Sequence, residues 1–476
     1  MVDVFRQELR VINVGVSGFA EAIRHAGGHA LDLEWAPPAG GDLGASHALA
    51  RLINRASVEE ANRKAFAAYL ASHPVLDGIG TAGTELPGMG ERMILHAGPP
   101  VAWEQMCGPM QGAITGAILY EGWAQDRASA MRLAASGEIT FAPCHDHNAV
   151  GPMAGVISPS MPVWIVTNRE GGNRAYSNLN EGLGKVLRFG ADSAEVIDRL
   201  KWMQRVLAPT LAAVVARLGS LELKPLIAQA LHMGDEVHNR NVAASSLLLK
   251  KLVPAALSSG RPQADLADVL AFIAANDHFF LNLSMAACKS MMDAAANIAG
   301  SSMVTAMCRN GVEFGIRLSG TGGAWFTAPA PQVEGLFFSG YGPQDAARDL
   351  GDSAITETAG VGGFAMAAAP AIVQFIGGSP RDALAHTLRM AHITLGRNNT
   401  FTLPSLDFAG TPACIDARKV ADTGIAPIIN TGIAHKKAGI GQVGAGITHA
   451  PMECFAKALT ALSSKLGVDE QKEDRP

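Results

Sequence analysis

The sequence predicts an α/β (α+β) multidomain protein, and three observations lead to that class. The chain of 476 residues is longer than one hydrophobic core usually serves. Its first part begins with a strand, a glycine turn, a helix and a strand, and a long helical pattern then separates two glycine-rich regions. We therefore expect an N-terminal βαβ-type α/β domain, a central Gly-rich α/β domain and an all-helical inserted domain. The expected boundaries are 1–100 for the first domain, 101–193 and 301–465 for the central domain, 194–300 for the helical insertion, and 466–476 for a disordered tail.

The N-terminal segment "LRVINVGVSGFAEAIRHAGGHALDLEW" predicts the strand, turn, helix and strand of a βαβ unit. Gly15, Gly18 and Asp32 resemble parts of a dinucleotide site. The spacing in "GVSGFA", however, is not the G-x-G-x-x-G arrangement that seats a pyrophosphate on a helix N-terminus. An ordinary βαβ turn is the favoured interpretation.

The helical pattern covers residues 194–296, as in "AEVIDRLKWMQRVLAPTLAAVVARLG" and "FFLNLSMAACKSMMDAAANI", with glycine and proline breaks. Glycine-rich strands and turns return after Gly300. The uncharged stretch "AGVGGFAMAAAPAIVQFIGG" is about long enough to span a bilayer. Its glycines and alanines, with Pro370 and Gln374, leave little transfer free energy for insertion. We expect a buried helix there, and no membrane contact.

Composition and charge exclude several classes of protein. Hydrophobic residues make 48% and charged residues 17% of the chain, which excludes a disordered protein. The net charge is −5 and no basic run is interleaved with aromatics, so nucleic acid is not an expected partner. The six cysteines include no C-x-x-C pair, and the first residues carry charges where a signal peptide is apolar. A cytoplasmic location with reduced thiols is therefore expected.

A short motif occurs twice. "CGPMQGAITG" and "VGPMAGVISP" share Gly-Pro-Met-x-Gly, which predicts a tight turn whose backbone N–H groups approach whatever faces it. The pair indicates either an anion-binding nest or two similar turns between neighbouring elements. The chain has no phosphate loop, no H-E-x-x-H zinc helix and no G-x-S-x-G nucleophile elbow, so its chemistry must be assembled from distant loops.

The densest group of chemically active residues is "CHDHN". His145 and His147 would point the same way on an extended segment. As zinc ligands they would need one or two donors from elsewhere in the chain. General acid/base work by one histidine and a hydrogen-bonded structural turn are the two alternatives. No metal and no cofactor is expected.

Four further clusters are candidates for binding an anion. "HMGDEVHNRN" can also be a helix cap made by its aspartate, and the two lysines of "HKK" can be a solvated surface. Backbone N–H groups after "GDSAITETAGVGGF" suit an anion, and "GRNN" offers a guanidinium fork and two amides. The predicted catalytic residues are His145, His147 and His435, and the predicted substrate-binding residues are Asp235, His238, Arg240, Asp352, Glu357, Arg397, Asn398, Asn399 and Lys436.

Long segments resemble one bacterial family. "CHDHNAVGPMAGVISPSMPVWIV", "GDSAITETAGVGGFAMA" and "DFAGTPACIDARKVADTGIAPIINTGIAHKKAGIGQVGAG" are similar to the YlbE/YahG-like proteins, and the similarity covers nearly the whole chain. The AllG-type member of that family is assigned as a component of oxamate carbamoyltransferase in allantoin catabolism. The resemblance carries over no catalytic residue. The chain also lacks the Ser-Thr-Arg-Thr loop with which aspartate and ornithine carbamoyltransferases hold carbamoyl phosphate.

The resemblance implies a function and a set of partners. It implies transfer of a carbamoyl group between phosphate and a small amide or ureido acid, with an anionic substrate carrying a carboxylate or phosphate. It also implies a complex with an FdrA-like subunit related to acyl-CoA synthetases. The high content of alanine, glycine and methionine, which leaves apolar surface for partners, predicts a homo-oligomer or such a complex. A non-catalytic subunit of that complex and a metal-dependent amidohydrolase centred on His145 and His147 are the alternatives. For the transferase, we expect the loop of His145 and His147 to meet Arg397, Asn398, Asn399 and the turn near His435.

Overall fold

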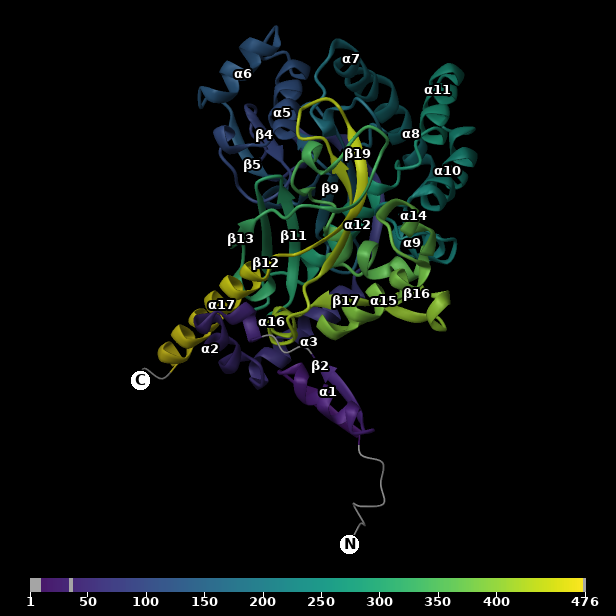
Figure 1. Cartoon of the computed structure of the whole chain (residues 1–476). Helices are drawn as coiled ribbons and strands as arrows, with labels where there is room; N and C mark the ends of the chain where they lie inside the picture. The colour runs from purple at the N-terminus through teal and green to yellow at the C-terminus, as the bar shows by residue number, and fades with distance from the viewer. Residues whose placement is uncertain (1–9, 34–36, 474–476) are drawn as a thin grey trace.

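The computed structural model describes residues 10–33 and 37–473 and confirms the predicted α/β class. Several small sheets form the interior, and helices cover them from the outside (Figure 1). Two large groups of buried apolar side chains hold these layers together. The first extends from Ala65 to Ala434, so it joins segments that are far apart in the sequence.

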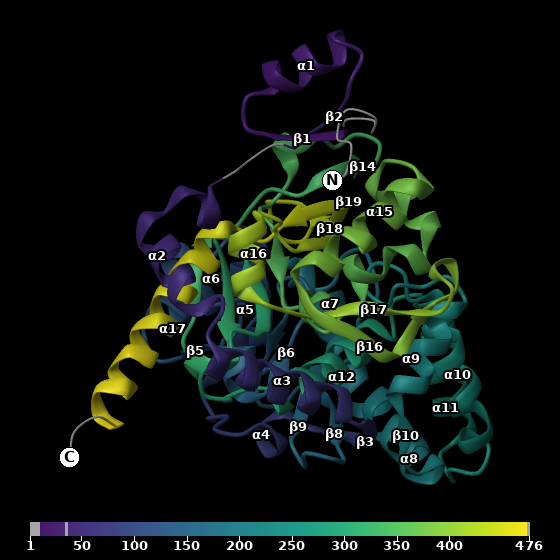
Figure 2. The same ribbon diagram turned by 90° about the horizontal axis from the view of Figure 1, so that it is seen from below.

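The N-terminal unit has the predicted strand, helix and strand. β1 (Arg10–Val14) pairs in parallel with β2 (His29–Leu33), and α1 (Ser17–His25) connects them. Figures 1 and 2 both show this unit standing off one side of the molecule. Several of its large apolar side chains are exposed: Ile12, Val14, Val16, Phe19 and Leu31.

Two sheets combine strands from both sides of residue 100. The five-stranded sheet has the order β10 (Leu221–Glu222), β3 (Pro74–Thr81), β8 (Pro162–Asn168), β9 (Arg174–Asn178), β6 (Ala149–Val150). The three-stranded sheet has the order β5 (Thr140–Pro143), β4 (Met93–His96), β7 (Val156–Ile157). The helices of this part of the chain are α2 (Leu43–Leu52), α3 (Ala56–Ala71), α4 (Ala82–Glu85), α5 (Gly108–Tyr120) and α6 (Arg127–Ala135). The predicted boundary at residue 100 therefore falls between strands that hydrogen-bond to each other.

The middle of the chain is helical, apart from the short strand β10. Its helices are α7 (Ala194–Trp202), α8 (Ala208–Leu218), α9 (Leu223–His232), α10 (Val242–Ala256), α11 (Gln263–Ala274) and α12 (Leu281–Ala294). Trp164 of β8 packs edge-on against Phe279, just before α12, with ring centroids 5.8 Å apart. α12 also contacts β9 and β11, so it lies between two sheets. The helical segment thus shares its core with the α/β part of the molecule.

The last third of the chain supplies three more sheets. One has the order β13 (Phe326–Pro329), β12 (Glu313–Leu318), β11 (Val304–Asn310), β15 (Leu350–Gly351); the second has β14 (Glu334–Phe337), β19 (Gln442–His449), β18 (Ile428–Ala434); the third pairs β16 (Thr394–Leu403) with β17 (Ala409–Ile415). The helices are α13 (Ile355–Thr358), α14 (Val373–Ile376), α15 (Pro380–Met390), α16 (Ala417–Thr423) and α17 (Met452–Glu473).

One segment differs from expectation. The stretch 359–378 is not one buried helix but a chain of short helical turns, because Gly360, Gly362 and Gly377 all have positive φ and Pro370 lacks an amide hydrogen. The predicted tail, residues 466–476, begins within α17, which continues to Glu473, and residues 474–476 lie outside the described part of the chain. None of the helices in the described ranges is long and apolar enough to cross a membrane.

Candidate active site

The CHDHN segment forms a short 3-10 helix, Cys144–His147, which connects β5 to β6. It ends at Asn148, whose φ of 56° is left-handed. A 3-10 helix has about three residues per turn, so side chains two positions apart point in different directions. His145 is buried, whereas the partly exposed His147 places Nδ1 2.7 Å from the carbonyl oxygen of Pro87. The two histidines therefore do not face one site.

Asp352 is fixed by two backbone amides. The N–H of Gly98 donates to Oδ1 at 2.8 Å, and the N–H of Gly151 donates to Oδ2 at 3.0 Å. Gly98 has a φ of +87°, and a Cβ there would lie 2.5 Å from the backbone of Arg309. Only glycine fits this position without displacing β11. The second Gly-Pro-Met turn therefore presents an amide to an anion, and that anion is the protein's own carboxylate.

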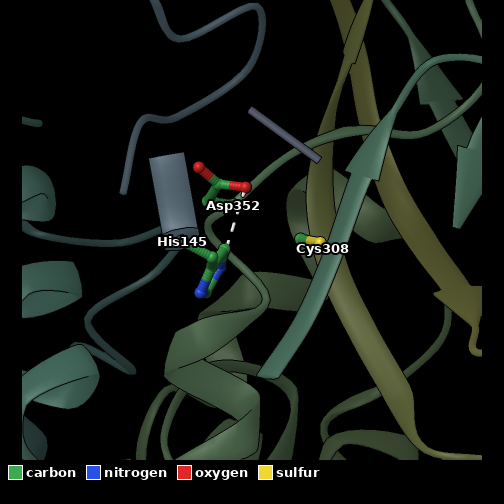
Figure 3. Close-up of side chains that lie close together, drawn as sticks. All are labelled: His145, Cys308 and Asp352. Carbon is green, nitrogen blue, oxygen red and sulfur yellow. Dashed lines mark ion pairs between the residues drawn. The ribbon is translucent and has the colours of Figure 1, made fainter. Parts of the chain in front are cut away.

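Cys308 of β11 completes a cluster with His145 and Asp352. The donor atoms of the three side chains all lie within 4.8 Å of one another, and all three residues are buried (Figure 3). β11 positions Cys308, and β15, which pairs with β11, ends directly before Asp352. We call these three residues the His145 cluster.

Burial controls the charges in the cluster. It raises the pKa of Asp352 to about 7 against the opposing effect of the two amides. It lowers the pKa of His145 well below its ordinary value and raises that of the Cys308 thiol. The ring of His145 is therefore neutral near pH 7. Its Nε2 lies 3.7 Å from Asp352 Oδ1, which is too long for a hydrogen bond, and neither ring nitrogen has a hydrogen-bond partner within the described chain.

A cavity of about 330 Å³ opens beside His145. The buried Lys289 of α12 pairs with Asp293 one helical turn later, and Arg317 of β12 pairs with Asp146. The guanidinium of Arg317 also lies 4.0 Å from the centre of the Trp325 ring. We call this space the His145 cavity, and it is lined by His145, Asp146, Asn148, Asn173, Arg174, Lys289, Asp293, Ala296, Asn297, Thr305, Ala306, Arg317, Gly322 and Gly323.

His238 and Glu357 form a second buried centre. His238 Nδ1 lies 2.7 Å from Glu357 Oε1, which also accepts the N–H of Gly363 at 2.8 Å. Thr356 donates its hydroxyl to Oε2 at 2.9 Å. The glycine-rich turn after α13 therefore binds an internal carboxylate, as the turns around Asp352 do.

The segment HMGDEVHNRN contains two more predicted residues, Asp235 and Arg240. Asp235 accepts the N–H of Ala244 in the first turn of α10, which is a helix-cap contact. Arg240 lines a separate cavity of about 400 Å³ together with apolar side chains such as Phe338 and Phe375. This second cavity has more apolar walls than the His145 cavity.

Arg397, Asn398 and Asn399 lie on β16. The exposed Arg397 donates to the carbonyl of Gly410 on the paired strand, and the buried Asn398 donates to the hydroxyl of Tyr69 at 2.6 Å. Asn399 is exposed. No described hydrogen bond or ion pair connects them to His145, and none of the three lines the His145 cavity.

His435 and Lys436 lie at the turn between β18 and β19. The buried His435 accepts the N–H of Lys437 at Nδ1, and its Nε2 lies 3.9 Å from Asp345. The exposed Lys436 donates to the carbonyl of Gln344. Of the sequence-predicted residues, the structure brings together His145 with Asp352, and His238 with Glu357.

Three residues of this region were not identified from the sequence: Cys308, Lys289 and Arg317. Lys289 offers a usable signal, because a single lysine with an aspartate four residues later interrupts the apolar helix "LSMAACKSMMDA". Cys308 and Arg317 are ordinary strand residues in the sequence. Only the pairing of β11 with β12 and β15 brings them to His145.

The fold and this region define a class: an α/β protein with a small, charged, partly enclosed cavity beside a cluster of three buried donor side chains. A family model described as oxamate carbamoyltransferase subunit AllG matches residues 139–353. The chain is 48% identical to the uncharacterized protein YahG of Escherichia coli (strain K12) over 468 residues, which cover 98% of this chain and 99% of that protein.

Two further comparisons agree. The chain is 51% identical to oxamate carbamoyltransferase subunit AllG of Escherichia coli (strain K12) over 379 residues, 79% of this chain and 90% of that protein. A crystal structure of a conserved protein of unknown function from Enterococcus faecalis V583 is 51% identical, with a TM-score of 0.85, and the match covers 86% of this chain and 98% of that chain. This chain belongs to the AllG family, which includes the YahG-like proteins.

Proposed function

We propose that the chain is a subunit of a carbamoyltransferase of the oxamate carbamoyltransferase type, and that the His145 cavity is its substrate site. The reaction would transfer a carbamoyl group between phosphate and a small amide or ureido acid. The observation that carries this proposal is the location of the cavity. Every lining residue falls between His145 and Gly323, inside the segment that the AllG family model matches.

The chemistry of the cavity walls supports an anionic substrate. Lys289, Arg317 and Arg174 bring three cations to the cavity walls, where Asp293 and Asp146 pair with the first two. Arg174 has its carboxylate partner, Glu85, 3.9 Å away and outside the lining of the cavity. A guanidinium can bind a carboxylate or phosphate through two parallel hydrogen bonds, and an ammonium can polarise a carbonyl. Asn148 and Asn297 add amide groups that match those of a carbamoyl or oxamate group.

Lys289→Met tests the site against a matched control. Lys224 is a second buried lysine, and it donates to the carbonyl of Leu70 outside the cavity. Calorimetric titration with carbamoyl phosphate and with oxamate should show at least about tenfold weaker binding for Lys289→Met, since a charge-assisted hydrogen bond contributes about 1.5–3 kcal/mol. Lys224→Met should bind like the unchanged protein. Equal weakening in both variants would remove Lys289 from the site.

Arg397→Lys tests the site predicted from the sequence in the same titration. This change keeps the charge but removes the guanidinium fork. If the His145 cavity is the substrate site, Arg397→Lys leaves the binding of both ligands unchanged. If Arg397→Lys weakens binding and Lys289→Met does not, the substrate lies near β16 and the proposal is wrong.

The same proposal includes an assembly with other subunits. The relative named above is called a subunit, and the N-terminal unit of this chain carries exposed Ile12, Val14 and Phe19 on an element that stands off the main body. A two-stranded unit of this kind is marginally stable alone, so contact with another chain would stabilise it. Light scattering should show an oligomer or a complex with a co-expressed FdrA-like protein, and Phe19→Asp should weaken it. A monomer that binds no such protein would contradict this part of the proposal.

A further inference from the structure

The three donors of the His145 cluster differ in type and come from three separate segments. His145 offers a ring nitrogen from the turn after β5, Cys308 a sulfur from β11, and Asp352 a carboxylate oxygen from the end of β15. All three residues are buried, so this cluster differs from the groups of exposed acidic side chains that are common on protein surfaces. Nitrogen, sulfur and oxygen donors from these residue types are those that zinc binds in proteins.

A second observation points to a missing partner for His145. Both nitrogens of this ring are buried and have no hydrogen-bond partner within the described residues. A buried polar group without a partner costs about 1–3 kcal/mol, so such groups are rare and call for an explanation. The carboxylate oxygen Oδ1 of Asp352 lies 3.7 Å from Nε2. That separation is too long for a hydrogen bond but leaves room for an atom bound between the two groups.

We propose that His145, Cys308 and Asp352 bind a divalent transition-metal ion, for which zinc is the best match. Donors about 2.0–2.3 Å from a tetrahedral zinc ion lie roughly 3.3–3.8 Å from one another. The separation of 3.7 Å between His145 Nε2 and Asp352 Oδ1 is in that range. The upper limit of 4.8 Å for the three donors requires a movement of only about 1 Å to close the site.

The surroundings of Asp352 are compatible with this role. Its two oxygens each accept one backbone N–H, from Gly98 and Gly151, and each carboxylate oxygen retains a further lone pair. Backbone amides that orient a ligating carboxylate are a common feature of metal sites. With one thiolate and one carboxylate, a divalent ion would form a neutral buried group, which avoids the cost of an isolated internal charge.

The site also borders the His145 cavity, since His145 lines that cavity. Three protein ligands leave one position of a tetrahedral ion for water or substrate, as in catalytic zinc sites. If the cavity is the substrate site, the ion would polarise a carbonyl oxygen bound there. This last step rests on the proposed function, whereas binding of the ion does not.

Metal content and a cobalt spectrum test the inference without an activity assay. The full chain, purified without chelator and reconstituted with zinc, should contain one ion per chain by elemental analysis. Cobalt in its place should give a thiolate-to-metal charge-transfer band from Cys308. Cys308→Ala should abolish that band and weaken zinc binding by at least about tenfold. The matched control Cys454→Ala removes a buried thiol of α17 and should change neither result.

Two further variants keep the test decisive. Asp352→Asn and His145→Ala should each weaken zinc binding, while His147→Ala should not, because His147 lies outside the cluster. Circular dichroism tests whether each variant is folded. If Cys308→Ala is not folded, Cys308→Ser is used in its place. A reconstituted protein without bound metal, or zinc retained in Cys308→Ala and His145→Ala, would overturn the inference. Neither result depends on Lys289 or on carbamoyl phosphate, so failure here leaves the proposed function standing.

Discussion

Two buried histidines, His238 and His145, lie beside two carboxylates of the same short segment, Glu357 and Asp352. The hydrogen bonding of the two pairs differs. His238 is 2.7 Å from Glu357, whose oxygens also accept hydrogen bonds from Gly363 and Thr356. His145 is 3.7 Å from Asp352 and has no hydrogen bond at either nitrogen in the described part of the chain. In the first pair, His238 Nδ1 and both oxygens of Glu357 have hydrogen-bond partners within the protein. The second has donor atoms to spare, which is the property that a binding site needs and a structural contact does not.

The largest expected effect comes from breaking the complete pair. Glu357→Ala would leave His238, the Thr356 hydroxyl and the N–H groups of Gly363 and Asn430 without their acceptor, so we expect a loss of about 3–5 kcal/mol in the free energy of unfolding. Urea denaturation followed by circular dichroism measures it. The exposed Glu60→Ala should change stability by less than about 0.5 kcal/mol. A loss below about 1 kcal/mol for Glu357→Ala would mean that the two centres do not differ in this way.

The second prediction concerns the incomplete pair. An ion that binds only the folded chain stabilises it by about 2.7 kcal/mol when its free concentration is a hundred times its dissociation constant. Zinc should therefore raise the melting temperature of the chelator-treated protein, and the gain should grow with zinc concentration. Cys308→Ala should show no gain. An increase of the same size in Cys308→Ala would locate the stabilising ion elsewhere.

Lys224 provides an intermediate case, a buried charge with a single partner. Burial lowers its pKa to about 8, so between about pH 8 and 10.5 the unfolded chain binds more protons than the folded one. The contribution of Lys224 to the free energy of unfolding should therefore rise with pH across this window, by about 2 kcal/mol once partial burial is allowed for. Lys224→Met should lose this rise. Denaturation at pH 7.5 and at pH 10 compares the two proteins, and parallel curves would contradict the assignment.

The smallest effect should come from His145 itself. In chelator-treated protein, His145→Phe keeps a ring against Trp325 and removes two polar atoms that have no partner. We expect a change in unfolding free energy below about 1 kcal/mol. In zinc-loaded protein the same change should remove the stabilisation by the metal. A loss as large as that of Glu357→Ala without metal would show that His145 is a structural residue.

The sequence predicted the fold class better than it predicted the division of the chain into domains. The spacing of apolar residues and the glycine content are local properties of a sequence. The N-terminal βαβ unit and the helices of residues 194–296 could therefore be predicted from the sequence directly. The pairing of β3 with β8 is not local, and no pattern in either strand indicates that it crosses residue 100. The domain boundaries therefore remain a prediction, with the sheets and the Trp164–Phe279 contact joining the segments on either side. The prediction of a buried helix at 359–378 was wrong because it gave the apolar composition more weight than the glycines and Pro370, which divide the segment into short helical turns.

For the site, the sequence identified residue types but not partners. His145 and Asp352 were both candidates, yet nothing in the sequence paired them or added Cys308. The glycine-rich turns were candidates for binding an anionic ligand, and at Gly151 and Gly363 the N–H groups donate to the protein's own carboxylates, Asp352 and Glu357. A turn that approaches an internal carboxylate has the same sequence as one that approaches a ligand. The predicted meeting of His147 with Arg397 rested on the groups that a carbamoyl-transfer pocket requires, namely a guanidinium, two amides, backbone N–H groups and a histidine. It stays a prediction without a described contact to support it.

The positions of the three donors along the chain have a consequence for folding. All the helices from α7 to α12 lie in the loop between His145 and Cys308, and a shorter loop separates Cys308 from Asp352. The cluster can therefore form only after the helical segment has been made and its two ends have come together. An ion bound there would join the three segments of the folded chain, so the helical segment could not separate from them without breaking a bond between the metal and a ligand. Metal loading would then slow unfolding of the whole central region, and the helical segment would be held at its base like a cross-linked loop.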